Sequence, residues 1–361
     1  MTVPVISITD LYHPPEDPGD NVDLIMAYGL PEIDLRAVIL DVLEEKRHLV
    51  DGGVPGYAGP RDPGVVAVTQ LNAIFGRDVP FAWCPFTRMQ SPNDRMYDVP
   101  PSQQRGVDLL INAVADSPEP VHLLSFGSAR PLALAFNRAP DVLREKVARI
   151  HLSAGTTTPT YPEWNVVQDP QAMIRIIDSG LPISLYRCAA DDGVAEHSCY
   201  GYDNHNTFWR LPDLKWIADM HPWLRRYLGY ALGRSTRPDF LRVLEEEAPA
   251  EQMAAIYQRS HSVWETAVWM EVSGRKLVRR EDGSYAIVPG ADVRDGDTVI
   301  RNEQVPCTVR SHPSGLYTFE LGEGSGGRTS VFVRDDPFEY EQALVEAMPA
   351  LYQSFRPCGL S

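Results

Sequence analysis

The sequence is poor in cysteine and has no closely spaced cysteine pair. Five cysteines are scattered over 361 residues, and no C-x-x-C motif occurs. An odd and scattered set argues against a disulfide framework and against a zinc site. We therefore expect reduced thiols and a cytoplasmic protein. The five are Cys84, Cys188, Cys199, Cys307 and Cys358.

Long apolar runs and an excess of positive charge are also missing. No stretch approaches the ~20 apolar residues of a membrane-spanning helix, so we expect no membrane contact. The opening "MTVPVISITD" has no basic residue before its short apolar run, which is untypical of a signal peptide. With 33 basic and 49 acidic residues the formal net charge is -16, which would repel a nucleic-acid backbone.

Glycine motifs that bind phosphate are not found either. No G-x-G-x-x-G or P-loop pattern follows a predicted strand, which argues against a phosphate- or dinucleotide-binding α/β enzyme. The segment "ELGEGSGGRTS" (320–330) contains the glycines, but it lies late in the chain among turn signals. We predict a hairpin loop there.

Short apolar runs alternate with helical patterns in the first half of the chain. The composition, 43% hydrophobic and 23% charged, is sufficient for a globular core. Continuous apolar runs without polar alternation are typical of buried parallel strands. We therefore predict an α/β fold with a mostly parallel central sheet and helices on both faces. The runs are residues 3–8, 35–40, 79–84, 121–126, 148–153 and 182–187.

The pattern changes after residue 190. Residues 191–270 are rich in aromatic side chains and helical signals, and we expect them to form a helical lid region. Residues 271–335 contain short β-segments with turn signals such as "EDGS" and "RDGD". A last helix is expected near residues 337–355. We expect all of these to belong to one domain, residues 1–361.

The turn after the first predicted strand is crowded with carboxylates. In open α/β sheets ligands bind beyond the carboxyl ends of the strands, which is where this turn lies. Like charges gathered in one turn repel, and a hard cation such as Ca²⁺, with 6–8 oxygen ligands, would relieve them. The later acids could instead stabilise the first turn of the following helix. The acids are Asp10, Glu16, Asp17, Asp20 and Asp23.

Several segments resemble the nucleoside hydrolases, the inosine–uridine-preferring N-ribohydrolase superfamily. "PVISITD…DPGDNVDLIMAYGLPEIDLRAVI" is similar to the family's opening strand, DxDPGxDD turn and helix. "VHLLSFGSARPLALAFNRAPDVLREKVARIHLSAG" and "TSVFVRDDPFEYEQALVEAM" match later parts of the family. "PEWNVVQDPQAMIRIIDSGLPISLY" is the most specific match, because its order of Glu, aromatic, Asn and Asp-Pro is hard to meet by chance.

The resemblance implies a calcium site. Asp10 and Asp20 take the places of two carboxylate ligands, and the backbone carbonyl of Phe126 takes the place of a third ligand. Glu265 stands where the family has a late Asp, which keeps the charge and adds a methylene group. An exposed helix acid is the alternative reading of Glu265.

The resemblance also implies a sugar and base pocket. Glu163 and Asn165 correspond to the residues that hold ribose, with Trp164 between them. The leaving base would be protonated or stacked by His261 or Trp264, with Trp209 and Tyr202 as further candidates. We expect His205 to contact substrate from an aromatic loop at 200–209, which could equally be an ordinary surface loop.

The sequence departs from the family at the general base. Gly19 aligns with that acid, and the turn before it is longer than usual. Asp17 or Glu16 would have to take over, and we select Asp17. The family's "AGN" after the second strand is replaced by "DVLEE". The resemblance therefore implies a calcium-dependent hydrolase of the N-glycosidic bond of a nucleoside or related ribosyl compound, and a homo-oligomer. The alternative is a catalytically impaired relative that binds metal and sugar.

Overall fold

The structure is a computed structural model. It describes residues 2–15, 17–48, 53–54, 56–156, 161–190, 200–322 and 327–359. Glu16 and Cys199 lie outside the described residues. Within these ranges, no helix has both the length and the apolar character needed to cross a membrane. The four described cysteines are all free thiols.

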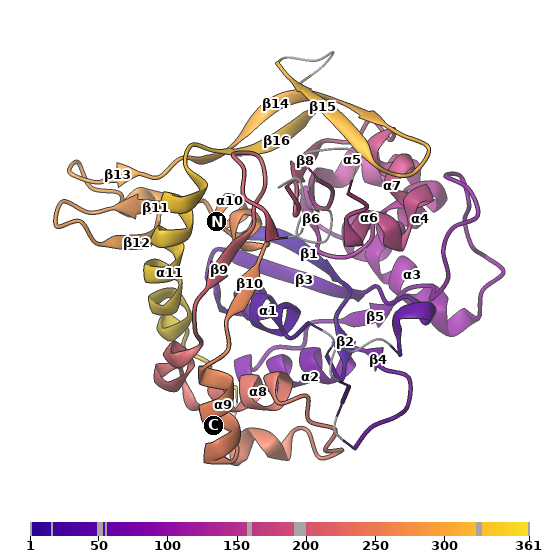
Figure 1. Ribbon diagram of the computed structural model, residues 1–361. Helices are drawn as coiled ribbons and strands as arrows, with labels where there is room; N and C mark the ends of the chain where they lie inside the picture. The colour runs from indigo at the N-terminus through magenta and orange to yellow at the C-terminus, as the bar shows by residue number, and fades with distance from the viewer. Residues whose placement is uncertain are drawn as a thin grey trace.

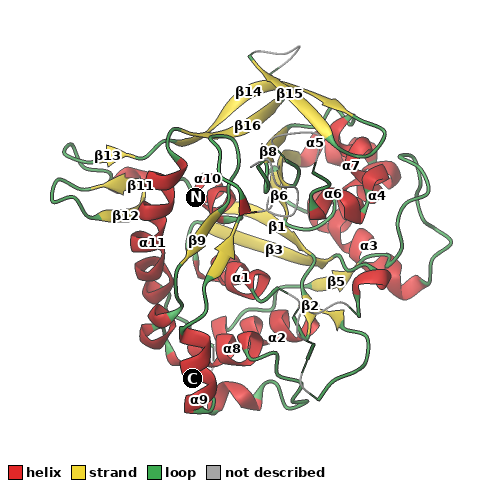
Figure 2. Cartoon of the chain, in the orientation of Figure 1, coloured by secondary structure: helices red, strands yellow, loops and turns green. Residues whose placement is uncertain are grey.

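A nine-stranded sheet forms the centre of the molecule (Figures 1 and 2). Its order is β15-β14-β16-β8-β7-β6-β1-β3-β5. The strands from β16 to β5 run parallel, whereas β14 and β15 extend one edge in antiparallel pairing. The strands are β1 Val3–Thr9, β3 Ile33–Leu40, β5 Phe81–Trp83, β6 Val121–Ser125, β7 Val147–Ser153, β8 Ile183–Tyr186, β14 Asn302–Ser311, β15 Tyr317–Leu321 and β16 Thr329–Arg334.

The predicted α/β architecture is confirmed. The six apolar runs correspond to β1, β3, β5, β6, β7 and β8. Helices cover both faces of the sheet. They are α1 Gly19–Gly29, α2 Val65–Phe75, α3 Pro101–Ala115, α4 Arg130–Arg138, α5 Pro140–Lys146, α6 Trp164–Gln168, α7 Pro170–Ile177, α8 Pro222–Leu232, α9 Ala250–Tyr257, α10 Thr266–Ser273 and α11 Pro337–Ser354. Short 3-10 turns lie at Glu44–Lys46, Lys215–Asp219, Arg242–Glu245 and Gly290–Asp292.

Alternation along β1 divides the core into two clusters. Val5 points to one face and packs in a cluster with side chains from α1, α2, α8, α10 and α11. Ile6 and Ile8 point to the other face and pack with side chains from α3, α4, α5 and α7. A strand that is apolar on both faces must be covered on both, which is why these runs show no polar alternation. Helix α2 was not anticipated, because it begins with the strand-like sequence "VVAV".

The region 191–270 is less helical than predicted. It contains α8, α9 and the start of α10, but also a two-stranded antiparallel ribbon formed by β9 (Trp209–Leu211) and β10 (His261–Val263). Each strand is buried at its first and third residue, the period of a strand rather than of a helix. In the β-rich region, β11 (Arg275–Arg279), β12 (Tyr285–Pro289) and β13 (Thr298–Val299) form a separate small sheet beside α11 (Figure 1). A short pair of β2 (Tyr12–His13) and β4 (Asp62–Pro63) lies near the end of β1.

A buried ion pair fixes the sheet end that carries the site. Arg130, at the start of α4, and Asp41, just after β3, are both fully buried and form a salt bridge. The Asp41 carboxylate also accepts a hydrogen bond of 2.6 Å from the Ser128 hydroxyl. Arg130 lies 3.9 Å from Asp169, the residue that caps α7. This pair therefore connects β3, α4 and α7 below the pocket described next.

We expect Arg130→Met to destabilise the fold strongly. The substitution leaves the Asp41 carboxylate buried without its cation, and breaking a buried pair in this way costs about 3–5 kcal/mol. Urea unfolding measures the loss. Arg144→Met is the matched control, because Arg144 and its partner Asp141 are exposed by 57% and 97%. A loss for Arg130→Met as small as that of the control would contradict the assignment.

Candidate active site

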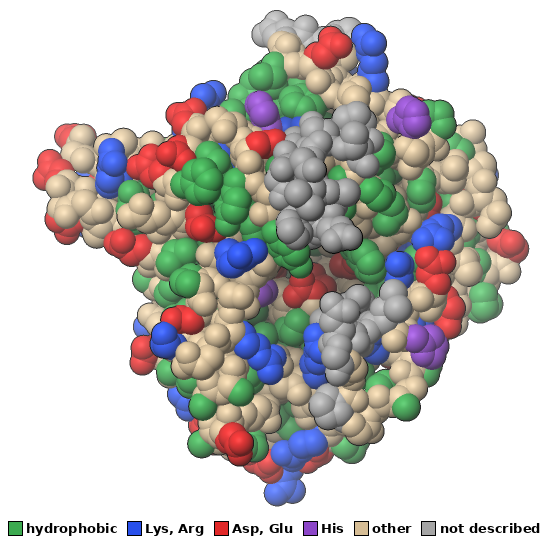
Figure 3. Space-filling model, in the orientation of Figure 1, with side chains coloured by type: hydrophobic (Ala, Val, Ile, Leu, Met, Phe, Trp, Pro, Cys, Tyr) green, Lys and Arg blue, Asp and Glu red, His purple; other side chains and the backbone are tan. Residues whose placement is uncertain are grey.

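A cavity of about 450 Å³ opens at the carboxyl end of the parallel strands. In the space-filling view acidic side chains lie at the bottom of a hollow near the centre of the face shown (Figure 3). Nine of the eleven site residues predicted from the sequence line it. They are Asp10, Asp17, Asp20, Phe126, Glu163, Trp164, Asn165, Trp264 and Glu265. The remaining lining residues are Tyr12, Pro18, Tyr161, Cys188, Tyr200 and Arg234.

Asp10 lies directly after β1 and is nearly buried. Its Oδ2 atom accepts hydrogen bonds from Gln168 Nε2 at 2.6 Å and from the indole nitrogen of Trp164 at 3.2 Å. The turn after β6 comes very close, since a Cβ atom on Gly127 would lie 3.0 Å from the Asp10 nitrogen. Asp10 is thereby held against the Phe126–Gly127 turn, as the sequence match implies.

Gly19 begins helix α1, and the space beside it is filled. Its backbone N–H donates to Asp17 Oδ1 at 2.7 Å, so Asp17 folds back over the helix start. A Cβ atom on Gly19 would lie 2.8 Å from His261 Cε1 and 2.9 Å from Asp17 Oδ1. No side chain fits at residue 19 unless Asp17 or His261 moves. The acid missing at this position has therefore been replaced by a different local packing.

Asp20, Asp23 and Glu265 form the acidic floor. Asp23 is buried within α1, and its carboxyl group is hydrogen-bonded to that of Glu265. Burial, and then the nearby Glu265 carboxylate, raise the pKa of Asp23 well above its usual value. Burial also raises the pKa of Glu265. The two carboxyl groups are therefore in direct contact beneath the pocket.

Glu163 caps helix α6 from the pocket wall. Its two carboxylate oxygens accept backbone hydrogen bonds from Gly155 at 2.7 Å, Asn165 at 2.9 Å and Val166 at 3.3 Å. Burial raises the pKa of Glu163 to about 7, and the three backbone donors oppose that shift. The side-chain amide of Asn165 donates to the Ser153 carbonyl at 2.8 Å and accepts from Gln168 at 3.2 Å.

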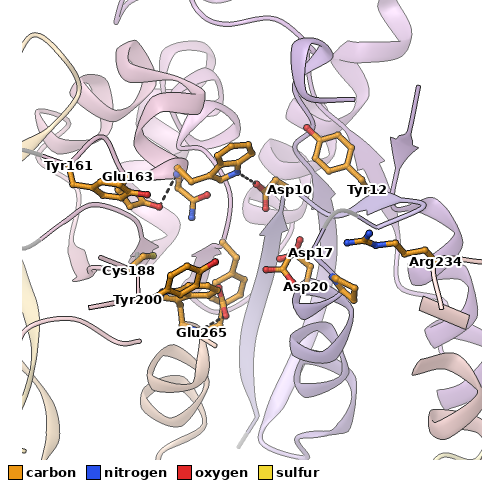
Figure 4. A pocket seen from close by; sticks show the side chains of 15 residues that line it. Asp10, Tyr12, Asp17, Asp20, Tyr161, Glu163, Cys188, Tyr200, Arg234 and Glu265 are labelled. Atoms are coloured by element: carbon orange, nitrogen blue, oxygen red, sulfur yellow. Dashed lines mark hydrogen bonds between the residues drawn. The ribbon is translucent and has the colours of Figure 1, made fainter. Parts of the chain in front are cut away.

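Aromatic rings form the walls above the acids (Figure 4). The rings of Tyr200 and Trp264 have centroids 6.3 Å apart. Trp164 lies against the other side, with the Lys46 ammonium group 4.4 Å from its ring centroid. Flat apolar faces above a carboxylate floor suit a ligand with an aromatic part and a hydroxyl-rich part.

Two predicted site histidines do not line the pocket. His261, in β10, lies behind the first turn of α1, where burial lowers its pKa and Asp17 opposes the shift. The ring of His205 packs edge-on against Phe319 in β15, with centroids 5.6 Å apart. Both positions follow from strand pairing and core packing, which the sequence pattern of the lid did not reveal.

The alternative candidates in the lid also lie elsewhere. Trp209 is fully buried and donates to the Thr266 hydroxyl at 3.0 Å. Tyr202 packs on Phe208 and hydrogen-bonds to Glu341. Tyr200 is the residue of this loop that reaches the pocket.

Sequence reasoning missed several residues of the site. Gln168 holds Asp10 and could have been found by its helical spacing of three from Asn165. Tyr12 and Pro18 lie in the turn already singled out for its acids. Arg234 follows α8 and has a left-handed backbone conformation (φ 48°). Nothing in the sequence around Arg234 indicates that it lies at the same pocket as the residues after the first strand. Burial raises the pKa of the Cys188 thiol well above its usual value, so it stays protonated at neutral pH.

The donor set suits a hard divalent cation. Carboxylates of Asp10, Asp20 and Glu265 and the Phe126 carbonyl border one cavity, and oxygen donors of this kind are what Ca²⁺ prefers. Across the described residues, no three His, Cys, Asp or Glu side chains are already closed around a common point. The geometry gives the reason: Asp10 is turned toward Gln168, and Glu265 is turned toward Asp23.

The fold and the pocket define an α/β protein with an acidic, aromatic-walled site at the carboxyl edge of its parallel strands. The family model described as inosine-uridine preferring nucleoside hydrolase matches residues 21–283, so the chain belongs to that family. The resemblance seen in the sequence is thus confirmed. A curated relative, the pyrimidine-specific ribonucleoside hydrolase RihA of Enterobacter sp. (strain 638), is 28% identical over 188 residues. The match covers 47% of this chain and 56% of RihA, so the chain spans about half the length of that relative.

Solved structures share the fold over the whole chain. A plant nucleoside hydrolase, PpNRh1, has a TM-score of 0.54 at 16% identity, covering 98% of this chain and 100% of that chain. The purine-preferring ribonucleoside hydrolase of Gardnerella vaginalis has a TM-score of 0.51 at 16% identity, with 97% and 99% covered. At such identities the similarity establishes the fold.

The buried Glu163 should make stability depend on pH. Its carboxyl group, with a pKa of about 7 in the folded protein, keeps a proton between about pH 4.5 and 7 that the unfolded chain has lost. The free energy of unfolding should therefore fall as pH rises through this window, by at most about 3 kcal/mol. Urea unfolding at a series of pH values measures it. The fall should be shallower in Glu163→Gln, and an identical profile would contradict the prediction.

Gly19→Ala should destabilise the protein, although Ala normally favours a helix. The added methyl group meets the His261 ring and the Asp17 carboxylate, and overpacking of this kind costs about 1–3 kcal/mol. Thermal or urea unfolding measures the loss of stability caused by Gly19→Ala, once in the wild-type protein and once in the His261→Ala variant. In His261→Ala, where the ring is gone, the same substitution should cost less. Equal costs in both backgrounds would show that the two residues do not compete for this space.

Proposed function

We propose that the protein is a calcium-dependent hydrolase that cleaves the N-glycosidic bond of a nucleoside or related ribosyl compound. The observation that carries the proposal is the meeting of an acidic floor, a sugar-sized polar wall and aromatic rings in one pocket. These residues come from separate parts of the chain, and their arrangement agrees with family membership. N-glycosidic cleavage proceeds through an oxocarbenium-like transition state, which carboxylates stabilise and orient.

Glu163 and Asn165 bind the sugar in this proposal. A carboxylate offers about four acceptor sites, and Glu163 uses three of them for backbone donors. One acceptor position is left for a sugar hydroxyl. The rigid cap and the Ser153 contact of Asn165 hold both groups in place before substrate binds, which lowers the entropic cost of orientation.

Asp10, Asp20, Glu265 and the Phe126 carbonyl hold the cation. When bound, Ca²⁺ would lower the pKa of the attacking water and orient it with the sugar hydroxyls. Gln168 and Trp164 keep Asp10 at the pocket edge through their hydrogen bonds to its Oδ2 atom.

Asp17 accepts the proton of the attacking water in place of the acid missing at residue 19. Its Oδ1 atom is fixed by the hydrogen bond from the Gly19 N–H. The carboxylate lies in the pocket beside Asp20 (Figure 4). His261 supports this arrangement from behind α1 rather than touching substrate.

The leaving base stacks on Trp264 and Tyr200. Within the described residues no histidine lines the pocket, so the aromatic wall takes the place of the predicted histidine contact. One relative is named as pyrimidine-specific and a solved structure as purine-preferring, and an aromatic wall can stack on either kind of base. A cytoplasmic homo-oligomer is part of the same proposal, supported by the free thiols and by family membership.

A second candidate is a relative that binds metal and sugar without turning over. Gly19 favours it, because the position that the alignment gives to the general base carries no side chain. Both candidate functions use the same pocket, and they differ in whether Asp17 acts as a general base.

Asp17→Asn distinguishes them. We expect kcat to fall by about 10²–10⁴-fold, the usual contribution of a positioned general base. Release of reducing sugar from a panel of purine and pyrimidine nucleosides is the assay. Asp116→Asn, an exposed acid at the end of α3, is the control and should retain wild-type rates. Equal rates for Asp17→Asn and wild type would remove Asp17 as base, and no release by wild type from any nucleoside would favour the binding protein.

A further inference from the structure

A second, smaller cavity lies inside the protein below the pocket floor. It is bordered by β1, α1 and α10, and it shares Asp20, Phe126 and Glu265 with the pocket above. Its other lining residues are Ser7, Thr9, Asp23, Leu24 and Trp269. Ser7 and Thr9, the two β1 residues that border this inner cavity, lie on the face of β1 that turns toward α1.

Asp23 is the unexpected residue here. It follows Asp20 by three positions, so both side chains lie on one face of α1. The residues on either side of it in the helix, Val22 and Leu24, are buried and apolar. Asp23 itself is 6% exposed, borders the inner cavity together with Asp20 and Glu265, and is hydrogen-bonded to Glu265. A buried carboxyl group in such surroundings is costly unless a cation or proton compensates it.

Ser7 gives an independent indication of a ligand. Its side chain is 1% exposed and borders the same cavity. Among the described residues and their polar atoms, its Oγ atom has no hydrogen-bond partner. Buried hydroxyl groups are nearly always satisfied, so an orphaned oxygen at a cavity that Asp20, Asp23 and Glu265 also line indicates a ligand for oxygen atoms there.

We propose that Asp23 is a further ligand of the cation in this chain, and that the ion is held from below by Asp23 and the Ser7 hydroxyl. The inference rests on the proposed function, because it concerns the same cation. Asp20 and Glu265 border both cavities, so their carboxyl groups lie between the outer pocket and the inner cavity. A larger oxygen set favours Ca²⁺, with its 6–8 ligands, over the stricter octahedral Mg²⁺.

Calcium binding to the full chain, stripped of metal with a chelator, tests this. Isothermal calorimetry gives the affinity, and Tb³⁺ luminescence excited through tryptophan gives a second readout, since Trp269 borders the cavity. We expect Asp23→Asn to weaken Ca²⁺ binding by more than about tenfold and Ser7→Ala to weaken it by less. Asp116→Asn, far from both cavities on α3, should bind as wild type does.

The outcomes separate this inference from the proposed function. If wild type binds Ca²⁺, Asp20→Asn loses it, and both Asp23→Asn and Ser7→Ala keep the wild-type affinity, then Asp23 is no ligand while the proposed site stands. If wild type itself gives neither heat nor luminescence, the calcium part of the proposed function fails, and this inference fails with it.

Folding of the variants is checked without metal. An amide at residue 23 can still hydrogen-bond Glu265 and carries no charge, so Asp23→Asn should melt at or above the wild-type temperature. Ser7→Ala changes one oxygen within β1 and is the variant that decides the matter if Asp23→Asn does not fold. Unchanged affinity in Ser7→Ala would then overturn the inner position of the ion.

Discussion

Repulsion among carboxylates at the end of β1 is the constraint around which this protein is built. Six acids border the pocket and the cavity below it, namely Asp10, Asp17, Asp20, Asp23, Glu163 and Glu265. Asp10 accepts from an amide and an indole, Asp17 accepts from the start of a helix, and Glu163 accepts from three backbone N–H groups. Asp23 and Glu265 are hydrogen-bonded to each other. The loops and helices that supply these donors are thereby tied to the acids that line the pocket.

The support for this site reaches into the sheet. Asp169 caps α7 and lies beside the buried Arg130–Asp41 pair, while its neighbour Gln168 holds Asp10. A single short segment thus joins an internal ion pair to the first acid of the site. Its backbone is further held by Arg88, which donates to the Gln168 carbonyl at 2.9 Å. Changes in the α6–α7 segment should therefore be felt in the pocket even where no side chain faces it.

The strands could be predicted from the sequence because their signals are local, whereas most of the candidate site residues were implied by the resemblance to the family. Continuous apolar runs specify buried strands, and parallel strands bring their carboxyl ends together, which places Asp10 near Phe126. The histidines could not be placed this way. Whether His261 or His205 faces the pocket depends on strand pairing and on Phe319, a contact across more than a hundred residues. The burial of the Asp23 side chain likewise depends on the packing between α1 and α10, which a local sequence pattern does not specify.

Packing around Gly19 restricts which residues can occupy this position. The volume that a carboxylate would need at residue 19 is occupied by the His261 ring and the Asp17 side chain. An Asp at residue 19 would collide with both, so this position can carry an acid only together with a change at residue 17 or 261. Lineages that share this glycine should therefore also share the longer turn and a side chain filling the place of His261.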